Sequence, residues 1–186
     1  MKKRLSRSFY TQPTLKVAQK LLGKYLVRKI EKQKLIGKIV ETEAYIGPQD
    51  KASHAYQNKR TKRNEAEFLI GGHIYIYLVY GMYWQLNIST YKENKPECVL
   101  IRAVEPIIKG KTEKEIKQLA NGPGKLCRFF QLDKSLYGED LTKSKRIWLE
   151  DWGDKIPKKK IKRTARIGID YAGPYWSKIK WRFVLK

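Results

Sequence analysis

Two glutamates lie close together in residues 40–45, Val-Glu-Thr-Glu-Ala-Tyr, within a chain that carries 41 Lys and Arg against 18 Asp and Glu. If residues 35–45 form a strand, Glu41, Glu43 and Tyr45 share one of its faces. A solvent-facing edge strand accounts for this spacing equally well. The functional alternative makes Glu43 a general base that activates water, and nearby positive charge would keep it ionised.

Tyrosine is concentrated in residues 75–83, where it occupies positions 75, 77, 80 and 83. Tyr75 and Tyr77 alternate onto one face of a predicted strand, a pattern typical of a half-buried sheet. The functional alternative assigns one ring to stacking on a nucleobase and Tyr80, at the strand end before Gly81, to insertion into a duplex. Beside a carboxylate and a basic surface, these rings indicate an enzyme that extrudes a nucleobase and acts on it.

Three further polar residues have both a structural and a functional interpretation. Asn87 lies in an apolar predicted strand and needs a hydrogen-bond partner, which is either a neighbouring strand or an extruded base. Arg102 lies in a similar strand, where an internal ion pair with Glu105 or a distant carboxylate is the structural alternative. His54 lies in a polar loop without the paired Cys or His residues of a zinc site, so we expect no metal and no cofactor.

The hydrophobic pattern predicts one α+β domain over residues 1–186, with an antiparallel or mixed sheet and helices at its periphery. Helices are predicted over residues 13–22, 112–120 and 125–130, and strands over 25–30, 35–45, 74–80, 84–90, 99–104, 167–169 and 180–185. Residues 47–63 and the Lys-rich residues 154–166 are predicted to be loops, the second of them mobile. The sequence contains no internal repeat and no convincing linker.

The composition constrains the partner and the compartment. A net charge of +23 favours an acidic partner such as nucleic acid, an anionic membrane surface or a ribosome, although a Lys-rich genome would also raise surface lysine. Cys98 and Cys127 form no CxxC motif, which favours a reducing compartment. No apolar signal segment and no membrane-spanning stretch are visible, so we expect a cytoplasmic, nucleoid-associated protein.

Several motifs follow one another in a characteristic order. They are Val-Glu-Thr-Glu-Ala-Tyr at 40–45, Gly47-Pro48, Asp50, Ala52, His54, Arg63-Asn64, residues 75–83, Asn87-Ile88-Ser89, residues 99–106 and residues 121–127. In order and spacing they resemble the alkyladenine (3-methyladenine) DNA glycosylase family, from about Phe9 to the C-terminus. The resemblance implies a single mixed domain around a curved antiparallel sheet with peripheral helices, and no metal.

The same resemblance implies a reaction and a partner. The expected enzyme is a monofunctional DNA glycosylase of base excision repair that hydrolyses N-glycosidic bonds and leaves an abasic site without strand cleavage. Its expected substrates are alkylated or deaminated purines in double-stranded DNA, namely 3-methyladenine, 7-methylguanine and hypoxanthine. We expect a monomer.

Roles for individual residues also come from the resemblance. Glu43 corresponds to the general base that orients and deprotonates the attacking water, and Arg102 to the residue that helps hold that glutamate and water. Tyr45, Tyr77 and His54 correspond to the walls of the base pocket, where the base is held between Tyr45 and either Tyr77 or His54.

Two more roles concern the duplex and the choice of base. Tyr80 corresponds to the ring that fills the gap left by the flipped nucleotide, and Asn87 to the side chain that clashes with the exocyclic amino group of guanine. Phosphate contacts are expected from the basic runs, which comprise Lys59, Arg60, Lys62, Arg63 and residues 155–166. Residues 151–166 are more Lys-rich than the family leads us to expect, and no known role of the family falls on them.

Two other classes of function remain alternatives. A non-catalytic basic RNA-binding or ribosome-associated protein explains the charge and the aromatic residues but gives Glu43 no task. A lyase-type glycosylase uses a lysine that forms a Schiff base with the sugar. The aromatic strand contains no lysine, although many lysines occur elsewhere.

Overall fold

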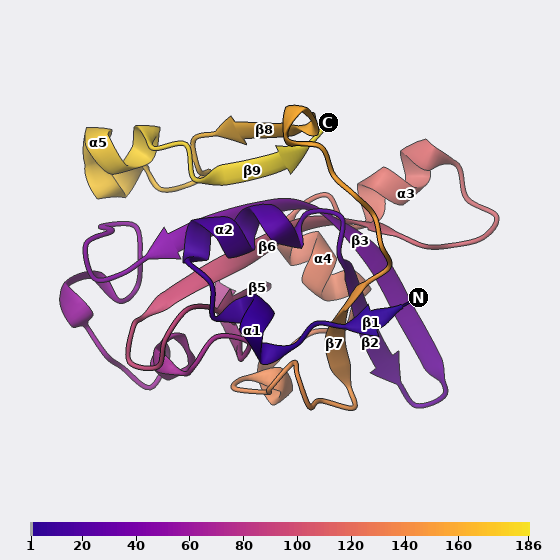
Figure 1. Ribbon diagram of the computed structural model, residues 1–186, viewed down its shortest axis with the longest axis horizontal. Coiled ribbons are helices and arrows are strands. Elements are labelled where there is room, and N and C mark those ends of the chain that lie inside the picture. The colour runs from indigo at the N-terminus through magenta and orange to yellow at the C-terminus, as the bar shows by residue number, and fades with distance from the viewer. Residues whose placement is uncertain (1) are drawn as a thin grey trace.

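Antiparallel strands organise residues 2–186, the part of the chain that the computed structural model describes (Figure 1). The strands are β1 Lys3–Arg4, β2 Tyr25–Ile30, β3 Gln33–Ile46, β4 Ile74–Val79, β5 Tyr83–Ser89, β6 Glu97–Pro106, β7 Ile147–Asp151, β8 Ile161–Thr164 and β9 Arg182–Leu185. They form one sheet in the order β1-β7-β2-β3-β6-β5-β4, while β9 pairs with β3 and β8 pairs with β9. Every pairing between these strands is antiparallel.

The long strand β3 lies inside the sheet. Its first half pairs with β2 and its second half with β9, while β6 runs beside it from Gly37 to Ile46. The register with β6 shifts on both sides of Glu41, which is typical of a β-bulge. Thr42, Glu43 and Ala44 are all fully buried, so the solvent-facing edge strand is ruled out.

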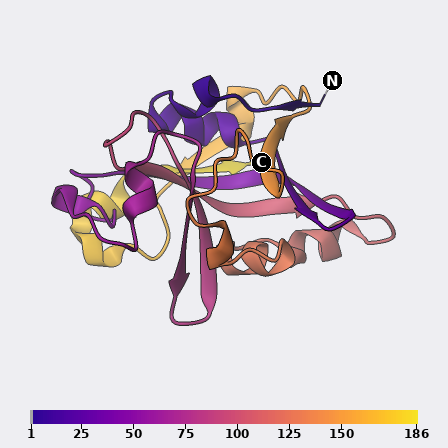
Figure 2. The same cartoon turned by 90° about the horizontal axis from the view of Figure 1, so that it is seen from below.

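Helices cover both faces of the sheet, as Figure 2 shows. One face carries α1 (Arg7–Tyr10) and α2 (Thr14–Leu21), and the other carries α3 (Glu113–Leu119) and α4 (Pro123–Phe129). α5 (Gly173–Lys178) lies beside β8 and β9 at one end of the molecule (Figure 1). Short 3-10 turns occur at Tyr56–Asn58, Glu65–Phe68, Lys134–Leu136, Lys158–Lys160 and Asp170–Ala172.

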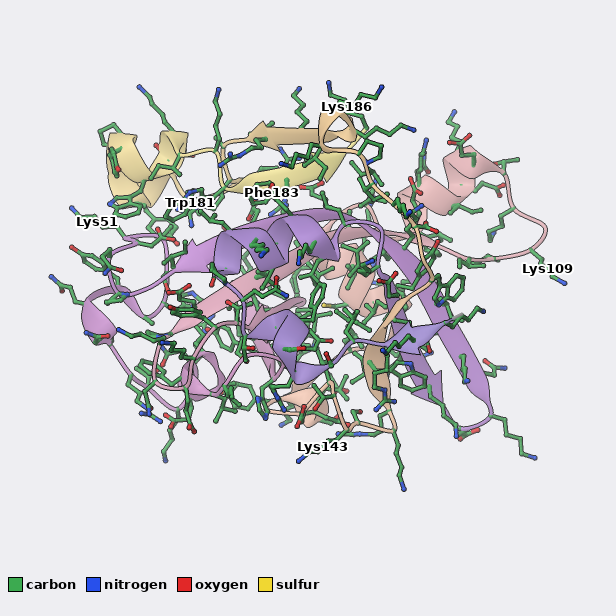
Figure 3. The ribbon with its side chains drawn as sticks, in the orientation of Figure 1. Lys51, Lys109, Lys143, Trp181, Phe183 and Lys186 are labelled. Atoms are coloured by element: carbon green, nitrogen blue, oxygen red, sulfur yellow. The ribbon has the colours of Figure 1, made fainter. Side chains whose placement is uncertain are left out.

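The hydrophobic core lies between the sheet and its helices. α2 contributes Val17, Ala18 and Leu21, which share one helical face and are fully buried. α4 contributes Leu126, and β9 contributes Phe183, which is labelled in Figure 3; both are fully buried. This core holds β3 and β6, the strands that position the candidate site, in a fixed relation.

The structure confirms the predicted α+β class, the three predicted helices and most of the predicted strands. Two predictions near the C-terminus are wrong. Residues 167–169 do not form a strand, and the strand β8 lies instead at Ile161–Thr164, within the predicted loop. Lys and Arg in that segment suggested a loop, but charged residues are tolerated on a strand at the edge of a sheet. The strands β1 and β7 were not predicted.

No helix in residues 2–186 has both the length and the apolar character needed to cross a membrane.

Candidate active site

A cavity of about 460 Å³ lies between β3, β4, β5 and the segment that follows β8. Sequence-predicted site residues from distant parts of the chain line it together: Tyr45, His54, Arg63, Tyr77, Tyr80, Asn87 and Arg102. Aromatic rings and polar groups therefore surround one space, which is large enough for a planar base.

Glu43 lies directly behind the wall of this cavity. Its Oε2 accepts a hydrogen bond from the Tyr45 hydroxyl at 2.8 Å, and its Oε1 accepts one from the backbone N–H of Ile167 at 2.9 Å. Nη1 of Arg102 lies 3.5 Å from Oε2. All three partners line the cavity, so the carboxyl group is fixed at both oxygens next to this space.

Burial raises the pKa of Glu43 above its ordinary value, while the Arg102 charge and the Ile167 N–H oppose that rise. We expected positive surroundings to dominate this group, but desolvation has the larger effect because the side chain is fully buried. A carboxylate with a raised pKa accepts a proton more readily, as a general base requires.

Arg102 is positioned by a second carboxylate. Its Nε donates to Oε1 of Glu41 at 2.8 Å, and Nε of Arg182 donates to the same oxygen at 2.5 Å. The expected internal ion pair therefore exists, with Glu41 rather than Glu105 as its partner. Glu41 holds the guanidinium so that a different nitrogen, Nη1, reaches toward Glu43.

The aromatic wall forms a connected group on β4 and the preceding loop. The His54 and Tyr77 rings meet edge to face with centroids 4.7 Å apart, and Nδ1 of His54 lies 2.6 Å from the Tyr75 hydroxyl. Burial and the charge of Arg63 lower the pKa of His54 to about 4, so the imidazole is neutral at pH 7 and shares one hydrogen bond with the Tyr75 hydroxyl. Tyr75 is thus a supporting residue that fixes the His54 ring.

Tyr80 stands at the tip of the hairpin formed by β4 and β5, which projects from the body of the molecule in Figure 2. Its side chain is 86% exposed. Both Tyr80 and Gly81 have positive φ, 51° and 68°, as the central residues of a type I′ turn do. A bulky residue is disfavoured at such a position, and an exposed aromatic ring there points to a function.

Asn87 is 1% exposed and lies on the cavity wall. Its Nδ2 donates to the carbonyl of Gln85 on the same strand at 3.2 Å, and its Oδ1 lies 3.9 Å from the Cys98 sulfur on β6. The side chain is therefore held in place and also borders the cavity. Its position agrees both with a role in joining two strands and with contact to an extruded base.

The basic residues expected to contact phosphates differ in their exposure and in whether protein groups already bind them. Lys59 and Lys62 are exposed, whereas Arg60 is paired with Glu65 and Arg63 donates to the Leu78 carbonyl at 3.0 Å.

In the second basic run, residues 155–166, Arg166 is not a phosphate contact, because its side chain is fully buried in an ion pair with Asp50. Its guanidinium lies over the Tyr45 ring, 4.7 Å from the centroid, and so supports the pocket wall.

Some residues of the site had no sequence signal. Ile167 contributes a backbone N–H, and any residue type could supply that group. Tyr171 and Glu67 line the cavity from segments that showed no periodic pattern. Within residues 2–186, no cluster of three or more His, Cys, Asp or Glu side chains is arranged to hold a metal ion.

A buried carboxylate behind an aromatic cavity, beside an exposed ring on a projecting hairpin, defines a class of enzyme that hydrolyses N-glycosyl bonds of extruded bases. Residues 8–186 match the family model described as methylpurine-DNA glycosylase, and the chain belongs to this family. The resemblance noted in the sequence and the expected enzyme class are thereby confirmed, and DNA is its substrate.

Relatives from bacteria and an archaeon cover almost the whole chain, and their names contain the words 3-methyladenine DNA glycosylase. The protein of Natranaerobius thermophilus is 43% identical over 191 residues, which span 98% of this chain and 96% of the relative. The Clostridioides difficile protein is 43% identical and covers 98% of this chain and 100% of its own. The Methanocella arvoryzae protein is 46% identical over 96% of this chain and 90% of its own.

Proposed function

We propose that residues 1–186 act as a single, monomeric and monofunctional DNA glycosylase domain that excises alkylated and deaminated purines from double-stranded DNA. 3-Methyladenine, 7-methylguanine and hypoxanthine are its substrates. The observation that carries this proposal is the Glu43 carboxyl group, which is hydrogen-bonded at both oxygens behind the aromatic cavity. A non-catalytic binding protein gives this carboxyl group no task.

The proposed reaction begins with an extruded nucleotide. Tyr80 fills the space that the base leaves in the duplex, and the base is held between Tyr45 and the rings of Tyr77 or His54. Stacking of this kind stabilises a base by roughly 1–3 kcal/mol. It needs no particular base sequence, which suits an enzyme that must search for lesions.

Hydrolysis then replaces the bond between sugar and base with a bond between the sugar and the oxygen of water. Glu43 takes a proton from water as the oxygen of that water bonds to C1′ of the sugar, and the base leaves with the electron pair of the broken bond. Arg102, held by Glu41, orients the carboxylate and the water. A cationic base such as 3-methyladenine departs readily because it already carries positive charge.

Asn87 is proposed to exclude normal guanine. Hypoxanthine has hydrogen at C2 where guanine has an amino group, and a fixed side chain facing this position rejects the larger group sterically. The contacts of Asn87 to Gln85 and Cys98 restrict its movement and so support this role.

One assay separates the classes of function. The protein is incubated with duplex DNA that contains a single hypoxanthine, and the product is examined with and without alkali. Nicks that need alkali identify a monofunctional glycosylase, nicks without alkali identify a lyase, and no nicks identify a binder. The lyase is disfavoured because, in the part of the chain that the structure describes, no lysine lines the cavity.

A further inference from the structure

A buried carboxyl group that the proposed reaction does not use lines the cavity itself. Glu67 belongs to the 3-10 turn Glu65–Phe68, is 2% exposed and lines the same space as Tyr75 and Asn87. No arginine or lysine pairs with it among the ion pairs of residues 2–186. A buried carboxyl group without a cationic partner is unusual, because desolvation strongly disfavours its charge.

The hydrogen bonds of Glu67 leave one oxygen unused. Oε1 accepts from the Cys98 thiol at 3.2 Å, while Oε2 has no hydrogen-bond partner in residues 2–186. The neighbouring Asn64 amide does not serve it, because Nδ2 of Asn64 donates to the carbonyls of His54 and Lys59. A buried polar atom without a partner is costly, and a ligand that enters the cavity would supply one.

Burial favours the neutral form of Glu67. It raises the pKa of Glu67 to about 7 although the nearby Cys98 and Asn64 side chains oppose the rise, and the negative charge of Asp50 adds a smaller effect in the same direction as burial. The titratable groups that face it are the Cys98 thiol and the hydroxyls of Tyr75 and Tyr77, whose pKa values burial also raises. Each of these groups is neutral at pH 7, and Cys98 already occupies Oε1, so a proton on Glu67 sits on Oε2, the oxygen without a partner.

We propose that Glu67 is a specificity-determining residue that donates a hydrogen bond from its neutral carboxyl group to the edge of a neutral purine lesion in the cavity. The proposal rests on the function proposed above and deepens it. A departing neutral base gains negative charge, which a hydrogen-bond donor stabilises. A cationic base such as 7-methylguanine becomes neutral on leaving and needs no such donor.

Two variants of similar size test this role on two substrates. Glu67→Met removes the donor, and Glu67→Gln keeps an N–H donor but cannot titrate. Single-turnover excision rates are measured on duplexes that contain hypoxanthine or 7-methylguanine, from pH 5.5 to 9. Circular dichroism and thermal melting check that each variant is folded.

Glu67→Met is expected to lower hypoxanthine excision relative to 7-methylguanine by roughly tenfold, the effect of removing one hydrogen bond. In the wild type, the rate of hypoxanthine excision is expected to fall as pH rises through about 7, which gives the pH profile an alkaline limb. In Glu67→Gln this fall in rate is expected to be absent. An unchanged ratio in Glu67→Met, or an alkaline limb that persists in Glu67→Gln, overturns the proposal. A proportional loss on both substrates with a lower melting temperature also overturns it, since that indicates a structural role.

The wild-type protein separates this proposal from the one on which it rests. If the wild type excises neither lesion, the proposed function is wrong. If it excises both and the variants keep its ratio and its pH profile, the proposed function stands and the role of Glu67 is wrong.

Discussion

The carboxyl group of Glu43 combines burial with fixed hydrogen bonds, so its removal tests the reaction directly. Glu43→Gln keeps the shape of the side chain and removes the base, and excision of either lesion should fall by roughly 100-fold or more. Binding to lesion-containing DNA should be retained in a mobility-shift assay. Glu113→Gln on the exposed helix α3 is the matched control and should behave like the wild type. Near-normal excision by Glu43→Gln contradicts the assignment.

Glu67 predicts a dependence of stability on pH. Its pKa is about 7 in the folded protein, above the ordinary value of 4.5. Folding therefore favours the neutral form: the stabilisation is complete below about pH 4.5 and is lost as pH rises through about 7. The wild type should lose this stabilisation between pH 4.5 and pH 8, whereas Glu67→Gln has no such group to titrate. The unfolding free energy of Glu67→Gln minus that of the wild type should therefore rise by on the order of a few kcal/mol from pH 4.5 to pH 8. Denaturant titrations at both pH values measure the difference, and an equal difference at both contradicts the shift.

Asn87 predicts a change in selectivity rather than in rate alone. Asn87→Ser shortens the side chain and keeps one polar group, so guanine in a mismatch should be excised faster relative to hypoxanthine. The two rates are compared in single-turnover assays. If Asn87 serves only to hold β5 to β6, both rates should fall in proportion and the melting temperature should fall with them.

The β4–β5 hairpin places an aromatic ring where the backbone favours glycine. Tyr80→Gly should not lower the melting temperature, because glycine adopts a φ of 51° without steric cost. The same change should weaken extrusion of the nucleotide, since no side chain then fills the vacated stack. A fluorescent base analogue in the duplex reports the extrusion equilibrium. Tyr175→Ala, which removes another exposed ring, is the control, and an unchanged equilibrium in Tyr80→Gly shows that the ring has no such role.

Elements with a clear periodic pattern could be predicted from the sequence, and those defined by distant contacts could not. The apolar alternation of β5, the continuous apolar run of β6 and the helical spacing of α2 are local properties of the chain. β8 forms from Ile161 to Thr164 because β9 pairs with it, and its Lys and Arg residues carry no strand signal. The same holds for the site: Glu43 stands in a local motif, whereas the Ile167 N–H reaches it only through the path of the chain after β8.

The positive charge of the whole molecule is not confined to one face. Lys51, Lys109, Lys143 and Lys186 extend from different sides of the protein in Figure 3. Part of the net charge of +23 therefore cannot contact one DNA duplex at the same time. Total charge thus overstates the number of phosphate contacts, and the residues near the cavity must be distinguished from the general background.

Salt dependence makes that distinction. Lys59 and Lys62 are exposed in the loop that leads to the cavity, and replacing both with glutamine should flatten the log–log salt dependence of DNA binding by about 1.8, or about 0.9 for each phosphate that is no longer neutralised. Lys109→Gln with Lys143→Gln removes the same charge elsewhere and should leave the slope nearly unchanged, because neither side chain lies in the loop that leads to the cavity or lines the cavity itself. Fluorescence anisotropy at several salt concentrations gives both slopes. Equal flattening by the two pairs means that the DNA responds to net charge alone, and the residues 59–63 then have no special place in the interface.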